Sequence, residues 1–146
     1  MSFLKRSPLV LVVALLTINM SCQKDLVFPE GSNKELLNKW EWIRSSGGFA
    51  GKVITPVSEG YSKTIEFSSK GIYKEFRNGK QVKKINFEIR EGKSMFGQSK
   101  AFIIKFENEE LINQSFLIRE DTLFLNEEVY DGFGHIFLKE DSNSND

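Results

Sequence analysis

The sequence predicts an all-β fold, an eight-stranded antiparallel up-and-down barrel. Apolar and polar side chains alternate with a period of two along most of the chain, tight-turn residues separate the alternating segments, and no long helical pattern interrupts them. Consecutive hairpins that share one apolar face bury it, and remove their open edges, by closing into a barrel. A β-sandwich is the alternative, because residues 45–61 form a connection long enough to cross between two sheets.

The predicted elements begin with a short helical turn. Asn33 is its expected N-cap, because the side-chain oxygen can accept a hydrogen bond from an unpaired backbone N–H, and the turn runs through Leu36 and Leu37. The eight predicted strands then span residues 39–44, 62–68, 72–77, 81–91, 100–107, 111–119, 122–126 and 133–139. Among the turns between them, Asn78 and Gly79 form the dipeptide most typical of two-residue hairpins, since both residues tolerate a positive φ.

The alternation assigns one face of each strand to the interior. The strand at 111–119 places Gln114 on the same face as Ile112, Phe116 and Ile118. A buried amide without partners costs about 1–3 kcal/mol. Either a neighbouring hydroxyl or water satisfies Gln114, or its amide orients a ligand inside an otherwise apolar cavity.

The start of the chain has the three parts of a secretory signal peptide, which we place at residues 1–21. Lys5 and Arg6 precede an apolar stretch at residues 9–18, and polar and small residues follow it. The stretch has about half of the roughly 20 residues that span a bilayer as a helix. We therefore expect a cleaved signal rather than a transmembrane helix.

The residues after this stretch resemble those of Bacteroidetes-type lipoproteins. Ser21 and Cys22 resemble a lipobox, which implies that Cys22 becomes the lipid-modified first residue of an outer-membrane lipoprotein. Gln23, Lys24 and Asp25 resemble the signal that sends some of these lipoproteins to the cell surface, and an ordinary polar tether is the alternative. The membrane, reached through the lipid, is then the first expected partner.

The remaining chain is expected to divide into three parts. Residues 22–33 contain Pro29 and Gly31 and few apolar groups, which predicts a flexible lipidated tether. Residues 34–140 form the barrel domain. Residues 141–146 are Asp, Ser and Asn alone and predict a disordered tail.

A second resemblance concerns the domain itself. Trp40 and Trp42, which open the first strand after the helical turn, resemble the start of lipocalins and lipocalin-like domains. The resemblance implies a small apolar or amphipathic ligand in the barrel. A filled barrel that contacts a protein or glycan through its loops is the alternative. The residues that alternation makes candidate ligand-binding walls are Trp42, Ile65, Phe87, Phe102, Phe106, Gln114 and Phe116.

Composition and side-chain chemistry narrow the function classes. Twenty basic and 20 acidic residues balance, which argues against nucleic-acid binding, and a single cysteine rules out a disulfide framework. We expect a monomer that is not an enzyme and has no cofactor, metal or catalytic residues: the sole histidine, His135, has no second histidine with which to bind zinc. Calcium at residues 126–132 is a minor alternative on oxygen content. We interpret the three acidic pairs as solvated charges at strand ends: Glu109 with Glu110, Glu120 with Asp121, and Glu127 with Glu128.

Overall fold

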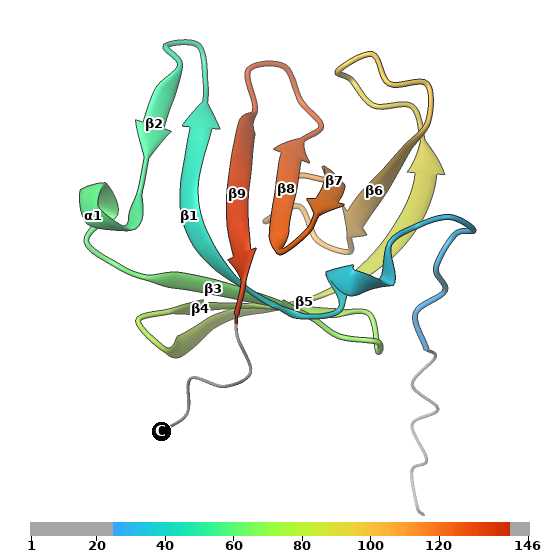
Figure 1. Cartoon of the computed structure of the whole chain (residues 1–146), viewed down its shortest axis with the longest axis horizontal. Helices are drawn as coiled ribbons and strands as arrows, with labels where there is room; N and C mark the ends of the chain where they lie inside the picture. Colours follow the sequence, from blue (N-terminus) through green and yellow to red (C-terminus); the bar gives the residue numbers. More distant parts are fainter. Residues whose placement is uncertain (1–24, 141–146) are drawn as a thin grey trace, which may run out of the picture.

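A computed structural model of the chain describes residues 25–140, and it confirms the all-β class and the closed antiparallel barrel (Figure 1). Eight strands form the barrel and a short ninth, β2, is added to β1. The elements are a 3₁₀ turn η1 (Lys34–Leu36), β1 (Lys39–Gly47), β2 (Lys52–Ile54), α1 (Pro56–Glu59), β3 (Lys63–Phe67), β4 (Ile72–Arg77), β5 (Lys80–Gly92), β6 (Ala101–Phe106), β7 (Gln114–Arg119), β8 (Thr122–Glu127) and β9 (Phe133–Lys139).

The barrel closes because β1 pairs on both sides. One edge of β1 forms a ladder with β3, from Lys39 opposite Glu66 onward, and the other forms a ladder with β9, from Trp40 opposite Lys139 onward. From β3 to β9, every strand pairs antiparallel with the next in the chain. This single closed series excludes the β-sandwich alternative.

The predicted loop at residues 45–61 is wrong in detail. β1 continues to Gly47 and forms a hairpin with β2, and the one-turn helix α1 follows. Gly48 and Gly51 make the tight turn possible, with φ of 72° and 60°. β2 has only three residues, two of them exposed, so it carries no alternation that a sequence pattern would reveal.

The strand predicted at 111–119 is also shorter than expected, because β7 begins at Gln114. Ile112 therefore lies outside the strand and is 41% exposed, whereas Phe116 is buried. Gln114 is half-buried. In residues 25–140, every fully buried side-chain nitrogen or oxygen has a hydrogen-bond partner, so Gln114 leaves no buried amide atom unsatisfied.

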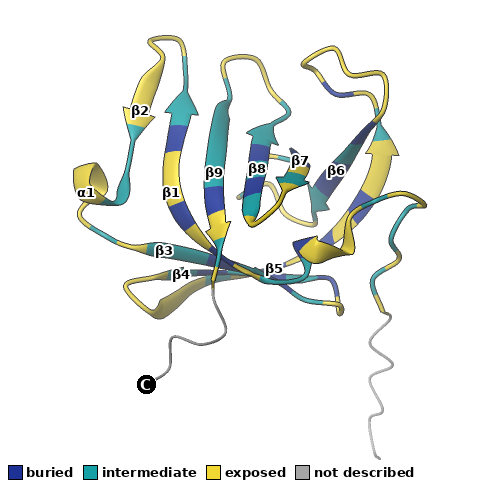
Figure 2. Cartoon of the chain, in the orientation of Figure 1, coloured by how far each residue is buried: buried dark blue, intermediate teal, exposed yellow. Residues whose placement is uncertain are grey.

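The buried side chains form one aromatic-rich core inside the barrel (Figure 2). The predicted helical turn is confirmed as η1, where Asn33 Oδ1 accepts a hydrogen bond of 2.8 Å from the Glu35 N–H. The turn places Leu36 in the core, and its carbonyl accepts a 3.0 Å hydrogen bond from the Trp40 indole N–H. The core residues at 8% exposure or less are Leu36, Trp40, Trp42, Ile65, Phe67, Tyr73, Ile85, Phe87, Ile89, Ile104, Phe116, Leu123, Leu125 and Phe137.

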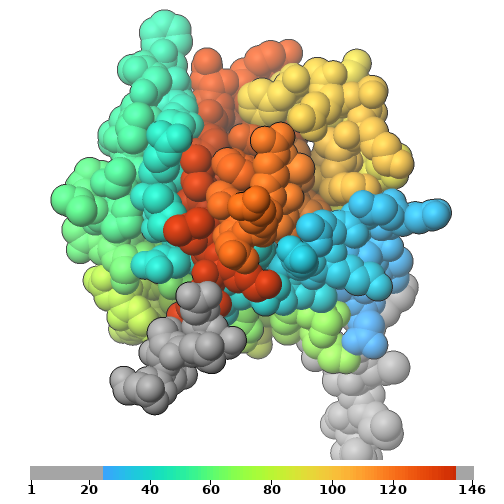
Figure 3. All heavy atoms as spheres, in the orientation of Figure 1, coloured from blue at the N-terminus to red at the C-terminus, as the bar shows by residue number. Residues whose placement is uncertain are grey.

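The chain before η1 lies against the barrel (Figure 3). The Leu26 N–H donates a 2.8 Å hydrogen bond to the Ser69 carbonyl, and both Leu26 and Phe28 pack on the core. This part of the predicted tether is thus held to the domain. Cys22, Gln23, Lys24, the predicted signal peptide and residues 141–146 lie outside the described residues. Between residues 25 and 140, no helix has the length and apolar character to cross a membrane.

Candidate functional site

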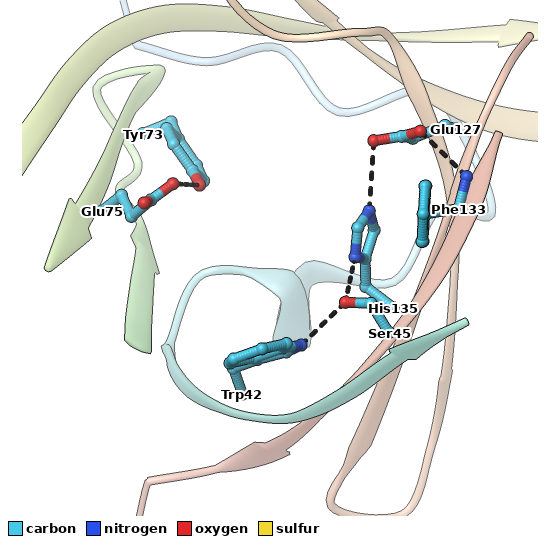
Figure 4. Close-up of polar contacts among 7 residues, drawn as sticks. All are labelled: Trp42, Ser45, Tyr73, Glu75, Glu127, Phe133 and His135. Carbon is cyan, nitrogen blue, oxygen red and sulfur yellow. Dashed lines mark hydrogen bonds and ion pairs between the residues drawn. The ribbon is translucent and has the colours of Figure 1, made fainter. Parts of the chain in front are cut away.

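Polar side chains from five strands meet inside the barrel, and Figure 4 draws those from β1, β4, β8 and β9. They lie near the ends where β1 and β8 finish and β3 and β9 begin, and two of them, Trp42 and Tyr73, also belong to the core. We call this group the inner polar cluster: Trp42, Ser45, Lys63, Tyr73, Glu75, Arg77, Glu127 and His135.

A β-bulge brings Ser45 into the cluster. The β1–β9 register shifts between Trp42, which is opposite Phe137, and Arg44, which is opposite Ile136. The extra residue reverses the alternation, so Ser45 rather than Arg44 points inward and is only 1% exposed. The bulge also places Ser45 directly opposite His135.

A continuous hydrogen-bonded chain runs from Trp42 to Glu127. The Trp42 indole N–H donates to Ser45 Oγ at 2.8 Å, Ser45 Oγ lies 2.5 Å from His135 Nδ1, and His135 Nε2 lies 3.3 Å from Glu127 Oε1. An indole N–H only donates, so the serine hydroxyl is free to donate onward to Nδ1. In this arrangement Nε2 carries the imidazole proton, and its N–H donates the hydrogen bond to the Glu127 carboxylate.

Glu127 ends this chain as a half-buried acceptor. Its Oε2 also accepts a 2.9 Å hydrogen bond from the Phe133 N–H. The hydrogen bond from His135 is the largest influence that lowers the pKa of Glu127, and burial opposes it. The interpretation of Glu127 as a solvated charge is therefore wrong, because its side chain is 18% exposed and hydrogen-bonded.

The neighbouring Glu128, which follows β8, also forms hydrogen bonds. It accepts hydrogen bonds from the Ser94 hydroxyl at 2.9 Å and from the Met95 N–H at 2.7 Å. Glu128 thus fastens the β5–β6 loop. Its interpretation as a solvated charge is wrong as well.

A second group of bonded side chains lies across the interior on β4 (Figure 4). Glu75 is 5% exposed and accepts hydrogen bonds from Arg77 Nε at 2.8 Å and from the Tyr73 hydroxyl at 3.3 Å. Burial, and then the neighbouring Glu75, raise the pKa of Tyr73 well above its ordinary value. The hydrogen bond with Glu75 raises the pKa of Arg77. The Glu75 carboxylate is thus balanced by a guanidinium at the barrel mouth.

Lys63 lies between these two groups and has no carboxylate partner. Its Nζ is 4.3 Å from the Trp42 ring centroid and 5.5 Å from that of Phe137, both buried rings. No ion pair within 4.0 Å involves Lys63 in the described part of the chain. Burial lowers the pKa of Lys63, although the nearby Glu75 and Glu127 charges act to raise it. The positive charge of the Lys63 ammonium is therefore only partly compensated by the nearby carboxylates.

The order Ser45, His135, Glu127 includes the residue types of a nucleophile, a base and an acid. A nucleophile must reach its substrate, however, and Ser45 is 1% exposed with its oxygen engaged by Trp42 and His135. We interpret the hydrogen-bonded series from Trp42 to Glu127 as a fixed polar network rather than an arrangement for acyl transfer. Within residues 25–140, no three His, Cys, Asp or Glu side chains are grouped to hold a metal ion.

The candidate ligand-binding walls mostly form the core. Trp42, Ile65, Phe87 and Phe116 belong to it, and Phe102 and Phe106 pack against it. The ring centroids of Phe102 and Phe116, for example, are 6.2 Å apart. Two hollows, of about 500 and 330 Å³, border Phe87 and Phe106 respectively, and both are lined largely by residues outside the predicted set.

Sequence reasoning missed most of the inner polar cluster. The bulge at Ser45 has no sequence signal that alternation would detect. Glu127 did have a sequence signal, since it continues the inward-facing series of Leu123 and Leu125. The predicted strand, however, ended at residue 126. The sequence identifies His135 as the sole histidine but does not identify its hydrogen-bond partners, Ser45 and Glu127. No family model, curated protein or solved structure matches the chain.

Proposed function

We propose that the chain is a lipid-anchored, lipocalin-like binding protein of the outer membrane, and that it takes a small amphipathic ligand with an anionic head at the inner polar cluster. The signal-like start, Cys22 and the residues Gln23, Lys24 and Asp25 support the anchor. The closed barrel supports the lipocalin-like part. Function itself rests on the site, because one barrel fold serves many roles.

The partly compensated Lys63 ammonium carries this proposal. Lys63 is half-buried, and burying a charge without an ion-pair partner is costly. An anionic group that arrives at Lys63 Nζ therefore forms the ion pair that the described residues leave unmade. The other charges are already matched, Glu75 by Arg77 and Glu127 by hydrogen bonds.

Aromatic side chains beside Lys63 suit the apolar part of the ligand. The Trp42 and Tyr61 rings stack at 6.1 Å with an interplanar angle of 24°, and Tyr61 lies just before β3 at the barrel mouth. The core residues, Trp42 among them, are at most 8% exposed. The ligand is therefore small, with its body against the half-buried Tyr61 ring rather than deep in the barrel.

Binding of dodecanoate and of dodecanol to the purified full-length chain, measured by titration calorimetry, tests the proposal. We expect Lys63→Met, which keeps most of the apolar stem, to weaken dodecanoate binding at least tenfold and to leave dodecanol unchanged. Lys84→Met is the matched control, because Lys84 is exposed on β5. Equal dodecanoate binding by the Lys63→Met and wild-type proteins would contradict the role of Lys63.

A filled barrel that binds a macromolecule through its loops is the second candidate. Phe49 is 96% exposed in the β1–β2 turn and Tyr130 is 89% exposed in the β8–β9 loop, and both loops lie at the same end of the barrel (Figure 1). Exposed aromatic side chains are typical of contact surfaces. Native mass spectrometry of the protein purified from its own cell envelope separates the two candidates. A retained small molecule supports the first candidate. A bound macromolecule that the wild-type protein retains and the Phe49→Ser variant does not supports the second.

A further inference from the structure

β5 extends beyond its neighbour β4 and leaves an open edge. Its ladder with β4 ends where Ile72 is opposite Asn86, and the last hydrogen bond on that side runs from the Phe87 N–H to the Gly71 carbonyl at 2.8 Å. On the other side, β5 stays paired with β6 as far as Gly92. Among residues 25–140, the end of β5, residues 88–92, therefore has a partner strand on one side only.

The direction of the unpaired groups follows from the ladder. Backbone N–H groups point to alternate sides along a strand. Since the Phe87 N–H points toward β4, those of Ile89 and Glu91 point the same way, with the Ile89 carbonyl beside them. Within residues 25–140, no backbone group on that side bonds to these N–H groups.

A hollow of about 500 Å³ lies along this edge. Leu26, Val27 and Pro29 of the N-terminal segment line it, together with Phe87 and Ile89 of β5. The N-terminal segment is held in place at one end.

Two contacts fix that end of the segment. Asp25 Oδ1 lies 2.6 Å from Lys70 Nζ, and the Leu26 N–H bonds to the Ser69 carbonyl. The slot is therefore open without any rearrangement of the segment. We call the hollow together with residues 88–92 the β5 slot.

We propose that the β5 slot binds an extended segment of a partner polypeptide, which adds to β5 as a further strand. An unpaired strand edge is matched by another backbone, because only a backbone supplies donors and acceptors at the strand repeat. An acyl chain would fill the apolar surface but would leave the Ile89 and Glu91 N–H groups without acceptors.

The charges around the slot indicate the partner's side chains. Three carboxylates, Asp25, Glu88 and Glu107, and two cations, Lys70 and Arg90, line it. Lys70 pairs with Asp25, and Arg90 pairs with Glu88 at 2.6 Å, so Glu107 is the charge left over. We therefore expect a segment in which apolar residues alternate with basic ones.

Amide hydrogen exchange followed by NMR on the full-length chain tests the proposal, with a capped hexapeptide of alternating valine and lysine as the probe. We expect the Ile89 and Glu91 amides to exchange rapidly in the free protein and at least tenfold more slowly with peptide. The same peptide with alternate amides N-methylated lacks the donors along one edge and should give no protection. Equal protection by both peptides, or none from the first at millimolar concentration, would overturn strand addition.

A pair of variants tests the edge itself. Glu91→Pro removes one outward N–H, and Glu91→Ala keeps it, while both lose the ion pair with Lys100. We expect equal thermal midpoints for the two variants and at least tenfold weaker peptide binding by the proline variant. Unfolding of Glu91→Pro alone would show that the N–H is already used and would refute the open edge. Protection that grows with protein concentration, without peptide, would assign the edge to a second copy and also refute the proposal.

Discussion

Replacing Ser45 by alanine tests the hydrogen-bonded chain that crosses the β1–β9 ladder. The hydroxyl accepts from the Trp42 indole N–H and bonds to His135 Nδ1, so its loss leaves one donor and one acceptor without partners. Trp42 is 1% exposed, which keeps water from its N–H. The His135 side chain is 13% exposed, so water replaces part of the hydrogen bonding that Nδ1 loses.

The expected magnitude follows from these exposures. A buried polar group left unsatisfied costs about 1–3 kcal/mol, and the partly solvated histidine costs less than the indole. We therefore expect Ser45→Ala to lower the free energy of unfolding by about 2–4 kcal/mol. With a urea m-value of about 1–3 kcal/mol/M, the unfolding midpoint falls by on the order of 1 M.

Urea unfolding followed by tryptophan fluorescence and by circular dichroism measures this loss, and a double-mutant cycle assigns it. Trp42→Phe removes the stranded donor, so Ser45→Ala should cost about 1–2 kcal/mol less in that background. Trp40→Phe is the control: the Trp40 indole bonds to the Leu36 carbonyl instead, and the two changes should add. A loss below about 0.5 kcal/mol, with no coupling to Trp42, would refute the reasoning.

Three other outcomes are expected. The pKa of Glu127 in the folded state lies below its ordinary value of 4.5, so the ionised carboxylate stabilises the fold above pH 4.5. This stabilisation is lost as the pH falls through the lowered pKa. The free energy of unfolding of Glu127→Gln should therefore depend less on pH in that range. Gly47→Ala should cost about 1–3 kcal/mol in urea unfolding, since its Cβ would meet the Phe133 Cα at 2.7 Å, and Gly51→Ala, with no neighbour within 4 Å, should cost less. Radiolabelled palmitate should mark the wild-type protein but not Cys22→Ala, and equal labelling would count against the anchor.

The barrel was predictable because its signal is local and repeated. Each barrel strand alternates over several residues and ends at a recognisable turn, such as Asn78 and Gly79, which both adopt a positive φ. Closure then follows from the need to bury one continuous apolar face. β2 escaped prediction because it is three residues long and its ladder is the hairpin with β1.

The site was far less predictable, for two physical reasons. A bulge shifts the register by one residue, so it moved Ser45 inward at a place where alternation assigned Arg44. The contacts that define the cluster also join residues distant in the chain, such as Ser45 and His135, and a local pattern carries no information on such pairs. Alternation did place Trp42 inside, but it did not show whether an inward ring borders a hollow or another ring.

The pairing of β1 with both β3 and β9 has a consequence for how the molecule is made. The ladder that completes the fold joins the first barrel strand to the last, and it continues to the hydrogen bond from the Glu140 N–H to the Lys39 carbonyl. Until β9 has emerged, one side of β1 has no partner, so the barrel cannot close before the last strand has been synthesised.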